Sequence, residues 1–349
     1  MSGAPVRPGS PRRVVVSRLD VAHHSGQKAP ADVRQMAGHL GFAAVDLAPF
    51  TRSSRTGRAV NISRAGLQAL VAAPTLARSQ VLLSQHPLGR VNDVVLDHVA
   101  RRTRSVVLVH DLESLRRIEY ARREQKTLSS YGVVIVHTPA MADYLREVLP
   151  DTRSVVLGCF DYLVTDPAPL PTLSPRPEAL YVIGSLGPDK AAYLYELGGL
   201  ALPVRAYGRG CLTEQLPVSV TWSGVLDMHR PQLPARDGFG VVWDGTSPDR
   251  LAGQMGTYLR YNSPHKFSMY LALGLPVVVA AGSALSELVE TEGIGLVAGS
   301  LADAACDAAA CSPVRWQQLA EQVQRLRQQI LNGDHVRTAL RQALALLEQ

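Results

Sequence analysis

Residues 237–296 read DGFGVVWDGTSPDRLAGQMGTYLRYNSPHKFSMYLALGLPVVVAAGSALSELVETEGIGL. Near the centre, Ser263 and Pro264 have the pattern of a helix start, because serine suits the capping position and proline the first helical position. Beyond this helix, the apolar run 277–279 predicts a short buried strand, and a second helix is expected after Gly282. The stretch therefore predicts a βαβ-type unit with two helix N-termini facing one crevice, where open α/β sheets bind nucleotides.

Lys266 falls in the first turn of the predicted helix, where the helix dipole disfavours a cation. Its position makes sense if an anion binds the exposed amide groups there and needs a counter-charge. The segment Gly187-Pro188-Asp189-Lys190 repeats the layout, so two of the four lysines of the chain have the same context. A single lysine could be a surface residue tolerated through screening. The repetition instead predicts a shared anion, most simply a diphosphate.

The composition is that of a soluble globular protein, with 46% hydrophobic and 19% charged residues among 349. This length is enough for two domains of ordinary size. The net charge of +6 suits anionic small molecules or a lipid surface, whereas no arginine-rich run with interleaved aromatic residues indicates nucleic acid. Four cysteines without ligand-like spacing, no hydrophobic signal core and no membrane-spanning run predict a cytoplasmic protein with reduced thiols.

Short apolar runs alternate with helical patterns in both halves of the chain, which predicts parallel sheets with helices on both faces. In the first half, strands are expected at 14–16, 43–47, 81–83, 105–109, 133–136 and 155–157, and helices near 30–40, 61–78, 92–102, 113–127 and 139–148. In the second half, strands are expected at 180–183, 204–207, 218–222, 240–243, 276–279 and 295–297.

One proline-rich segment divides these two halves. We expect a disordered leader at 1–11, a Rossmann-like domain at 12–164, the linker at 165–178, a second Rossmann-like domain at 179–311 and helices at 312–349. Two such domains joined by a linker predict a binding cleft between them.

Three titratable residues, His110, Asp111 and Glu113, follow the expected strand 105–109 at its carboxyl end, where ligands bind in such sheets. One of them could supply a general base. The same residues also fit a helix start in which Asp111 caps and Glu113 is favourable in the first turn. The two interpretations stay open, and they are compatible with each other.

The loop after the first expected strand carries Ser25, Gly26 and Lys28, which we expect to face the cleft. His23 and His24 in this loop are a poor metal pair, because neighbours in sequence rarely converge on one ion and no third ligand is placed. The sequence therefore predicts no metal site.

Glu287 lies one turn into the helix expected after 277–279, where a carboxylate can accept hydrogen bonds from ribose hydroxyls. Ser283 and the neighbouring amides would then meet phosphate. Acidic residues are also ordinary in a first helical turn. The chain has no Asp-x-Asp motif, no Gly-Lys-Ser/Thr phosphate loop and no GxSxG, which disfavours kinases and hydrolases.

The segments FGVVWDG (239–245) and YLRYNSPHKFSMYLALGLPVVV (258–279) resemble the nucleotide-binding half of GT-B glycosyltransferases. The likeness is to β-1,6-galactofuranosyltransferase-like proteins and to the accessory glucosyltransferases that glycosylate serine-rich-repeat adhesins. It runs from the first strand to about residue 305, through SGQKAPAD (25–32), HDLESLR (110–116), LGCFDYL (157–163) and GSLGPDK (184–190).

The resemblance implies that Lys190 and Lys266 hold the diphosphate of a UDP-sugar and that Glu287 faces its ribose. The chain departs from the large EX7E class of these enzymes, because the first acidic position of that pattern falls near Met269. It also has Gly184-Ser185-Leu186-Gly187 where many relatives carry an AGN-like turn.

The expected protein is an α/β, GT-B glycosyltransferase that moves a hexose, galactofuranose or glucose, from a UDP-sugar to a hydroxyl of a glycan, glycolipid or glycoprotein. It would use no cofactor and no metal. Asp111 is the first candidate for the general base, and His110 and Glu113 are the next candidates. A nucleotide-sugar epimerase of the same fold and a non-catalytic partner subunit remain as alternatives. A homo-oligomer and a peripheral position at the inner face of the membrane also stay open.

The predicted donor site comprises residues of the second half of the chain: Gly187, Lys190, Tyr207, Asp244, Asn262, His265, Lys266, Ser283 and Glu287. The predicted acceptor side comprises Ser25, Gly26 and Lys28.

Overall fold

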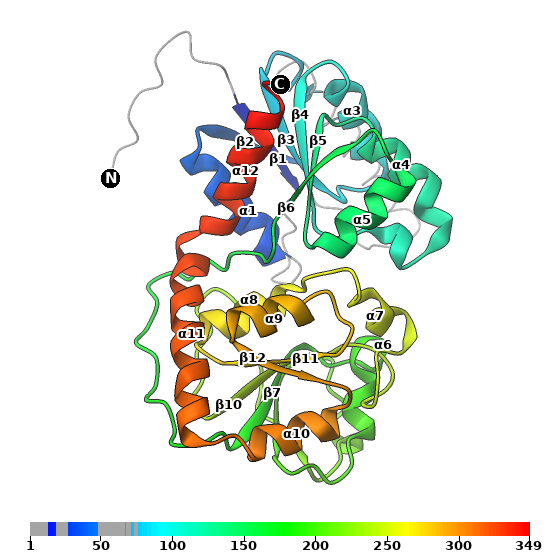
Figure 1. Cartoon of the computed structure of the whole chain (residues 1–349). Helices are drawn as coiled ribbons and strands as arrows, with labels where there is room; N and C mark the ends of the chain where they lie inside the picture. Colours follow the sequence, from blue (N-terminus) through cyan, green and yellow to red (C-terminus); the bar gives the residue numbers. More distant parts are fainter. Residues whose placement is uncertain (1–12, 19–26, 48–66, 68–70, 73–75) are drawn as a thin grey trace. The chain divides into compact units, whose positions relative to one another are not determined.

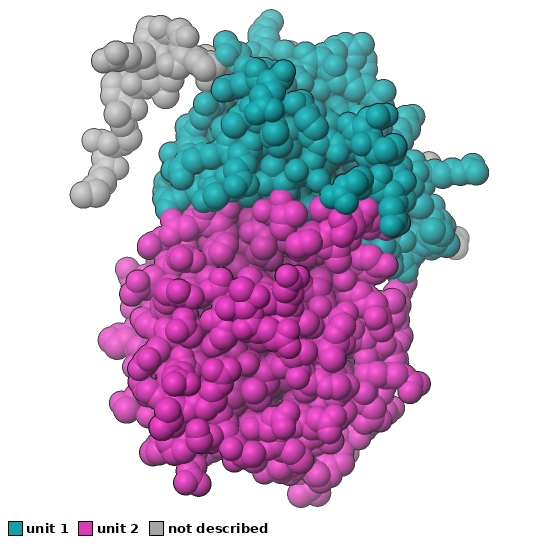
Figure 2. Space-filling model, in the orientation of Figure 1, with its two compact units in different colours: residues 1–136, 145–155, 337–349 teal, residues 137–144, 156–336 magenta. Residues whose placement is uncertain are grey.

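The computed structural model describes residues 13–18, 27–47, 67, 71–72 and 76–349. The expected leader at 1–11, the predicted acceptor residues Ser25 and Gly26, and most of the expected helix 61–78 lie outside these residues. By its internal contacts the chain divides into two units, coloured teal and magenta in Figure 2. Unit 1 contains residues 1–136, 145–155 and 337–349, and unit 2 contains residues 137–144 and 156–336.

The described part of unit 1 is built on a six-stranded sheet of order β2-β1-β3-β4-β5-β6 (Figure 1). Its strands are β1 (Arg13–Arg18), β2 (Phe42–Leu47), β3 (Val81–His86), β4 (Arg104–Val109), β5 (Val133–Val136) and β6 (Arg153–Val156). The pairings from β2 to β5 are parallel. Strands β3 and β5 are buried along their whole length, as strands of a parallel sheet covered on both faces should be.

The helical elements of the first half are α1 (Lys28–His39), α3 (Arg90–Ala100), η2 (Glu113–Leu115), η3 (Ile118–Tyr120), α4 (Ala121–Leu128) and α5 (Pro139–Val148). The prediction of one helix at 113–127 is therefore wrong for its first part, which forms two 3₁₀ turns. The extended backbone of Arg117, with φ −143° and ψ 106°, interrupts it. Asp111 does not cap the first turn either, because Leu112 occupies the cap position.

Unit 2 is built on a fully parallel six-stranded sheet of order β12-β11-β10-β7-β8-β9. Its strands are β7 (Ala179–Ser185), β8 (Val204–Arg209), β9 (Val220–Trp222), β10 (Gly238–Val242), β11 (Val277–Ala280) and β12 (Gly295–Ala298). Read from β9, this is the doubly wound order of dinucleotide-binding sheets, with the reversal between β7 and β10. All strands expected from the sequence overlap observed strands of the two sheets, which confirms the α/β prediction.

The helical elements that follow in the chain are α6 (Pro188–Ala191), η4 (Ala192–Glu196), η5 (Thr213–Gln215), α7 (Gly253–Tyr258), α8 (His265–Ala272), α9 (Ser286–Glu292), α10 (Leu301–Ala309), α11 (Pro313–Asn332) and α12 (Asp334–Leu346). Two apolar clusters cover the two faces of the unit 2 sheet. Val278 packs in one cluster whereas Val277 and Val279 pack in the other, because successive side chains of a strand point to opposite faces.

Helix α8 begins one residue later than the sequence predicted. Pro264, with φ −70° and ψ 142°, occupies the cap position, and His265 is the first helical residue. Ser263 does not cap the helix, because its side chain makes no capping hydrogen bond and its backbone N–H donates to His137 Nδ1 at 3.3 Å. The residue expected to cap the helix is thus bonded to a residue far back in the chain.

The division into units differs from the predicted domain boundaries. Residues 137–144 and 156–164 belong to unit 2, and residues 337–349, expected with the C-terminal helices, belong to unit 1. Two arginines of unit 1 hold this end of the chain: Arg104 donates to Leu347 O at 2.8 Å, and Arg153 donates to Leu346 O. Side chains far away in sequence make these contacts, and local periodicity does not reveal them.

Candidate active site

Three predicted donor residues meet at the switch point of the unit 2 sheet. Lys190 follows β7 and Asp244 follows β10, so both lie at the carboxyl edge where the strand order reverses. Lys266, the second residue of α8, donates through Nζ to Asp244 Oδ1 at 2.8 Å and to the carbonyl of Trp243 at 2.7 Å. The Nζ of Lys190 lies 4.0 Å from Asp244 Oδ2. The carboxylate of Asp244 is therefore flanked by two ammonium groups.

Lys266 is a cation with little access to water, since its side chain is 11% exposed. Burial lowers its pKa below the ordinary value, the charge of Asp244 opposes this shift, and the charge of Lys190 adds to it. The sequence analysis expected a bound diphosphate beside this lysine, which stays a prediction, and the anionic group that the structure shows there is the carboxylate of Asp244. We refer to Lys190, Asp244 and Lys266 as the lysine cluster.

Backbone contacts join the loop after β7 to the loop after β10. Gly187 precedes the first residue of α6, and its carbonyl accepts from Lys190 N at 2.9 Å. The carbonyl of Lys190 in turn accepts from Gly245 N at 2.8 Å. The two loops are thus bonded through main-chain atoms, which places the Lys190 side chain beside Asp244.

Ser283 and Glu287 lie beyond β11, the neighbour of β10, and so at the same edge of the sheet. Ser283 Oγ is 3.2 Å from Ser286 Oγ, and Glu287 is exposed in the first turn of α9. Within the described residues, no hydrogen bond or ion pair joins either residue to the lysine cluster. A role at the ribose for Glu287 stays a prediction.

The remaining predicted donor residues are aromatic or amide groups. Tyr207, near the end of β8, is buried with its ring stacked on Tyr181 at 6.4 Å between centroids. The ring of His265 stacks on Tyr162 at 4.9 Å. Asn262 is buried just before α8, and its Oδ1 has no hydrogen-bond partner among the described residues. Such an orphaned oxygen calls for an explanation, and a ligand donor at this helix start would supply one.

In unit 1 the strand order reverses between β1 and β3, and Gln85 near the end of β3 bridges this point. Its Nε2 donates to Ser17 Oγ at 2.6 Å and to the carbonyl of Pro30 at 3.2 Å. Its Oε1 lies 2.7 Å from Nε2 of His110, which follows β4. Because a carbonyl only accepts, the Pro30 contact fixes the amide orientation of Gln85 and assigns the proton of the neutral His110 ring to Nε2.

The sequence analysis missed Gln85. The pattern that could have revealed it is the change from apolar to polar residues at the carboxyl end of the strand 81–86, which reads VLLSQH.

The other two candidate bases, Asp111 and Glu113, differ in their contacts. Asp111 accepts from Arg116 NH2 at 2.7 Å, and its side chain is 34% exposed. The side chain of Glu113 is exposed, and its backbone N–H donates to Glu124 Oε1 at 2.7 Å. Asp111 and His110 therefore each have an orienting partner, which suits a group that must accept a proton in one geometry.

Lys28, predicted on the acceptor side, is the first residue of α1 and is 3% exposed. Its ammonium group pairs with the carboxylate of Asp32, one turn further along the helix. Burial lowers the pKa of Lys28, and the charge of Asp32 opposes the shift. The residue is thus engaged within its own helix, and its role toward an acceptor stays a prediction.

Two domain models of one family match the chain. The N-terminal model of the glucosyltransferase 3-like family matches residues 13–159, and its C-terminal model matches residues 180–343. The chain belongs to the glucosyltransferase 3-like family. It is a glycosyltransferase of the GT-B fold, as the resemblance in the sequence implied.

This glucosyltransferase 3-like chain is similar to the β-1,6-galactofuranosyltransferase WbbI of Escherichia coli (strain K12). The two are 26% identical over 274 residues, which cover 77% of this chain and 80% of that protein. The sucrose-phosphate synthase of Thermosynechococcus elongatus has a TM-score of 0.64 at 14% identity, covering 96% of this chain and 99% of that one. The UDP-forming trehalose-phosphate synthase of Burkholderia vietnamiensis has a TM-score of 0.57 at 11% identity, covering 98% of this chain and 100% of that one. These two structures support the fold alone.

Among the described residues of this family member, no group of three or more His, Cys, Asp or Glu could hold a metal ion. None of the helices in the described part of the chain is both long and apolar enough to span a lipid bilayer.

Proposed function

We propose that this glucosyltransferase 3-like chain transfers a hexose, galactofuranose or glucose, from a UDP-sugar to a hydroxyl group of a glycan, glycolipid or glycoprotein, without a metal ion. The observation that carries the proposal is the lysine cluster at the switch point of the unit 2 sheet. Nucleotides bind at this place in doubly wound sheets.

The lysine cluster suits a diphosphate because of its remaining hydrogen-bonding capacity. An ammonium group has three N–H donors, and Lys266 uses two of them on Asp244 and Trp243. The third N–H remains for a phosphate oxygen. Lys190 lies 4.0 Å from the carboxylate, too far for a hydrogen bond, so its ammonium group can also donate to phosphate. Negative charge grows on the departing UDP as the glycosidic bond breaks, so fixed ammonium groups lower the barrier to transfer.

The family supports the finer parts of the proposal. The models that match are named for a glucosyltransferase, and the relative from Escherichia coli is named for galactofuranosyl transfer. Both names describe transfer of a hexose, and we carry that class of sugar over to this chain.

Unit 1 would bind the acceptor and supply the base. Asp111, oriented by Arg116, is the first candidate, and His110, oriented by Gln85, is the second. Either would take the proton of the acceptor hydroxyl as its oxygen attacks the anomeric carbon in an inverting reaction. With Nε2 of His110 protonated toward Gln85, Nδ1 carries the lone pair of the neutral ring.

The experiment is a donor screen scored by UDP release, with and without a set of glycan acceptors. Acceptor-dependent UDP release, with sugar appearing on the acceptor, is the expected result. Chromatography of the UDP-sugar separates two other outcomes. Interconversion of UDP-sugars without acceptor would indicate an epimerase, and UDP binding without turnover of any donor would indicate a non-catalytic subunit.

A further inference from the structure

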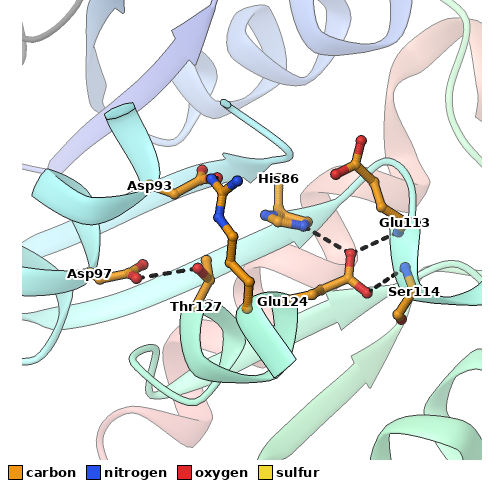
Figure 3. Close-up of polar contacts among 8 residues, drawn as sticks. His86, Asp93, Asp97, Glu113, Ser114, Glu124 and Thr127 are labelled. Carbon is orange, nitrogen blue, oxygen red and sulfur yellow. Dashed lines mark hydrogen bonds and ion pairs between the residues drawn. The ribbon is translucent and has the colours of Figure 1, made fainter. Parts of the chain in front are cut away.

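The turn His110–Ser114 is held from two sides by consecutive residues of β3. Gln85 and His86 point to opposite faces of the strand, as neighbours in a strand do. Gln85 bonds the ring of His110, and the carbonyl of His86 accepts from the backbone N–H of His110 at 2.7 Å. The side chain of His86 contributes through Glu124 of α4, whose Oε1 lies 3.2 Å from His86 Nε2 (Figure 3).

Glu124 holds the far end of this turn. Its Oε1 accepts from the N–H of Glu113 at 2.7 Å, and its Oε2 accepts from the N–H of Ser114 at 3.0 Å. Figure 3 shows the carboxylate of Glu124 between the His86 ring and these two amides. The side chains of Glu124 and His86 are 5% and 6% exposed, so water competes little for these bonds. One carboxylate thus ties a strand, a helix and the turn together.

Charged groups on the elements packed around His86 favour its protonated form. Asp93 on α3 is paired with Arg123 of α4 at 2.8 Å, and Asp97 accepts from Thr127 at 3.2 Å. Burial works to lower the pKa of His86, but the bond to Glu124 and the charges of Asp93, Glu124 and Glu113 outweigh it and raise the pKa. Burial likewise works to raise the pKa of Glu124, and its bonds to His86 and Ser114 lower it.

We infer that Glu124, bonded to His86, is a positioning residue that fixes the turn carrying His110 and Asp111. The catalytic consequence rests on the proposed function. A buried ion pair contributes little to stability compared with apolar residues of the same volume, so its place beside the candidate bases favours a role in geometry. Asp111 itself is one-third exposed, with Arg116 as its ion-pair partner. The buried bonds of Gln85, His86 and Glu124 thus hold the two ends of the turn.

The variant Glu124→Gln removes the charge and one of the two acceptor oxygens, with little change of shape. The matched control is Glu119→Gln, an exposed glutamate of the neighbouring 3₁₀ turn η3. Hydrogen exchange of the peptide spanning 112–116 should be faster by about fivefold or more in Glu124→Gln, the factor implied by loss of one ordinary hydrogen bond. Exchange within the unit 2 sheet should be unchanged.

Turnover supplies the second measurement. A misplacement of about 1 Å at a reacting group can lower the rate on the order of 10²-fold. We expect a loss of kcat approaching that size in Glu124→Gln, with the KM for the donor unchanged because donor binding is assigned to unit 2. His86→Gln keeps a neutral donor toward Glu124. It should also speed hydrogen exchange of 112–116 and lower kcat, but by less than Glu124→Gln. It also serves as the second variant if Glu124→Gln does not fold.

The inference would be overturned if peptide 112–116 exchanged no faster in Glu124→Gln and His86→Gln than in the control Glu119→Gln. This outcome does not depend on the turnover of the wild-type chain. Faster exchange with unchanged kcat would also overturn it, because the turn would then not matter to the reaction. A wild-type chain that releases no UDP from any donor would instead count against the proposed function, while the exchange measurement would still decide whether Glu124 holds the turn.

Discussion

The ammonium group of Lys266 donates to the carboxylate of Asp244 at 2.8 Å, across two side chains that are 11% and 4% exposed. This ion pair lies where the order of the unit 2 strands reverses, with Lys190 on its other side. A cation in the first turn of a helix is disfavoured by the helix dipole, and Asp244 compensates for it within the chain. The pair therefore joins α8 to the end of β10, with the ammonium groups of Lys266 and Lys190 at the predicted diphosphate site.

The first prediction concerns the stability of this pair. Lys266→Met should lower the free energy of unfolding by up to about 3–5 kcal/mol, because Asp244 would stay buried with only Lys190, 4.0 Å away, as a cation. Adding Asp244→Asn to this variant should restore most of the lost free energy of unfolding. Urea unfolding of both variants measures this. The control is Glu292→Gln, which breaks the exposed pair with Arg325 and should change stability by only about 0–1 kcal/mol. Equal effects at the two pairs would contradict the prediction.

The second prediction concerns donor binding by Lys190. This lysine is 33% exposed, and its removal leaves the buried carboxylate of Asp244 paired with Lys266, so the fold should remain intact. Lys190→Ala should weaken UDP binding by about 1.5–3 kcal/mol, the range for a hydrogen bond to a charged group. Calorimetry measures the affinity, with the exposed Lys126→Ala of α4 as control. Unchanged affinity in Lys190→Ala would remove the lysine from the diphosphate site.

A third prediction concerns metal ions. If two lysines and the α8 amides stabilise the leaving diphosphate, acceptor-dependent UDP release should continue at its full rate in EDTA. The comparison is the rate of the same preparation before chelation and after addition of magnesium or manganese. Loss of activity in EDTA with recovery on metal addition would contradict the lysine-based mechanism.

The fourth prediction separates the candidate bases. Asp111→Asn should lower turnover by roughly 10²–10⁴-fold, the usual contribution of a general base, and leave UDP affinity nearly unchanged. Calorimetry and initial rates on the same protein test both parts. His110→Asn is the companion variant: if it shows the larger loss and Asp111→Asn turns over almost normally, the base is His110. Loss of UDP binding in Asp111→Asn would show that the donor also contacts unit 1.

The fifth prediction is a pH dependence of stability at the His86–Glu124 pair. The pKa of His86 is raised above 6.5, so its contribution is complete below that value and is lost as the pH rises through the raised pKa. The pKa of Glu124 is lowered below 4.5, so its contribution is complete above that value and is lost as the pH falls through the lowered pKa. The difference in unfolding free energy between wild type and Glu124→Gln should therefore be largest between 4.5 and 6.5. A difference independent of pH would contradict the pairing.

The sequence by itself determined the class of fold and the elements that make it. Apolar runs such as 277–279 and the helical pattern after Pro264 are local, because side-chain burial repeats every two residues in a strand and about every 3.6 in a helix. The two Gly/Ser-Pro-x-Lys segments also pointed to Lys190 and Lys266, since a helix start has its own residue preferences. These inferences needed no knowledge of which strands are neighbours.

Only the tertiary structure decided what those residues contact. The order of the strands set the reversal between β7 and β10, and with it the pairing of Lys266 with Asp244, 22 residues earlier in the chain. Likewise Gln85 reached His110 across 25 residues, and Glu124 reached back to the amides of Glu113 and Ser114 over the two 3₁₀ turns. The physical reason is that strand pairing and side-chain hydrogen bonds join segments that periodicity treats separately. Which charge is buried beside which is a property of the packed sheet.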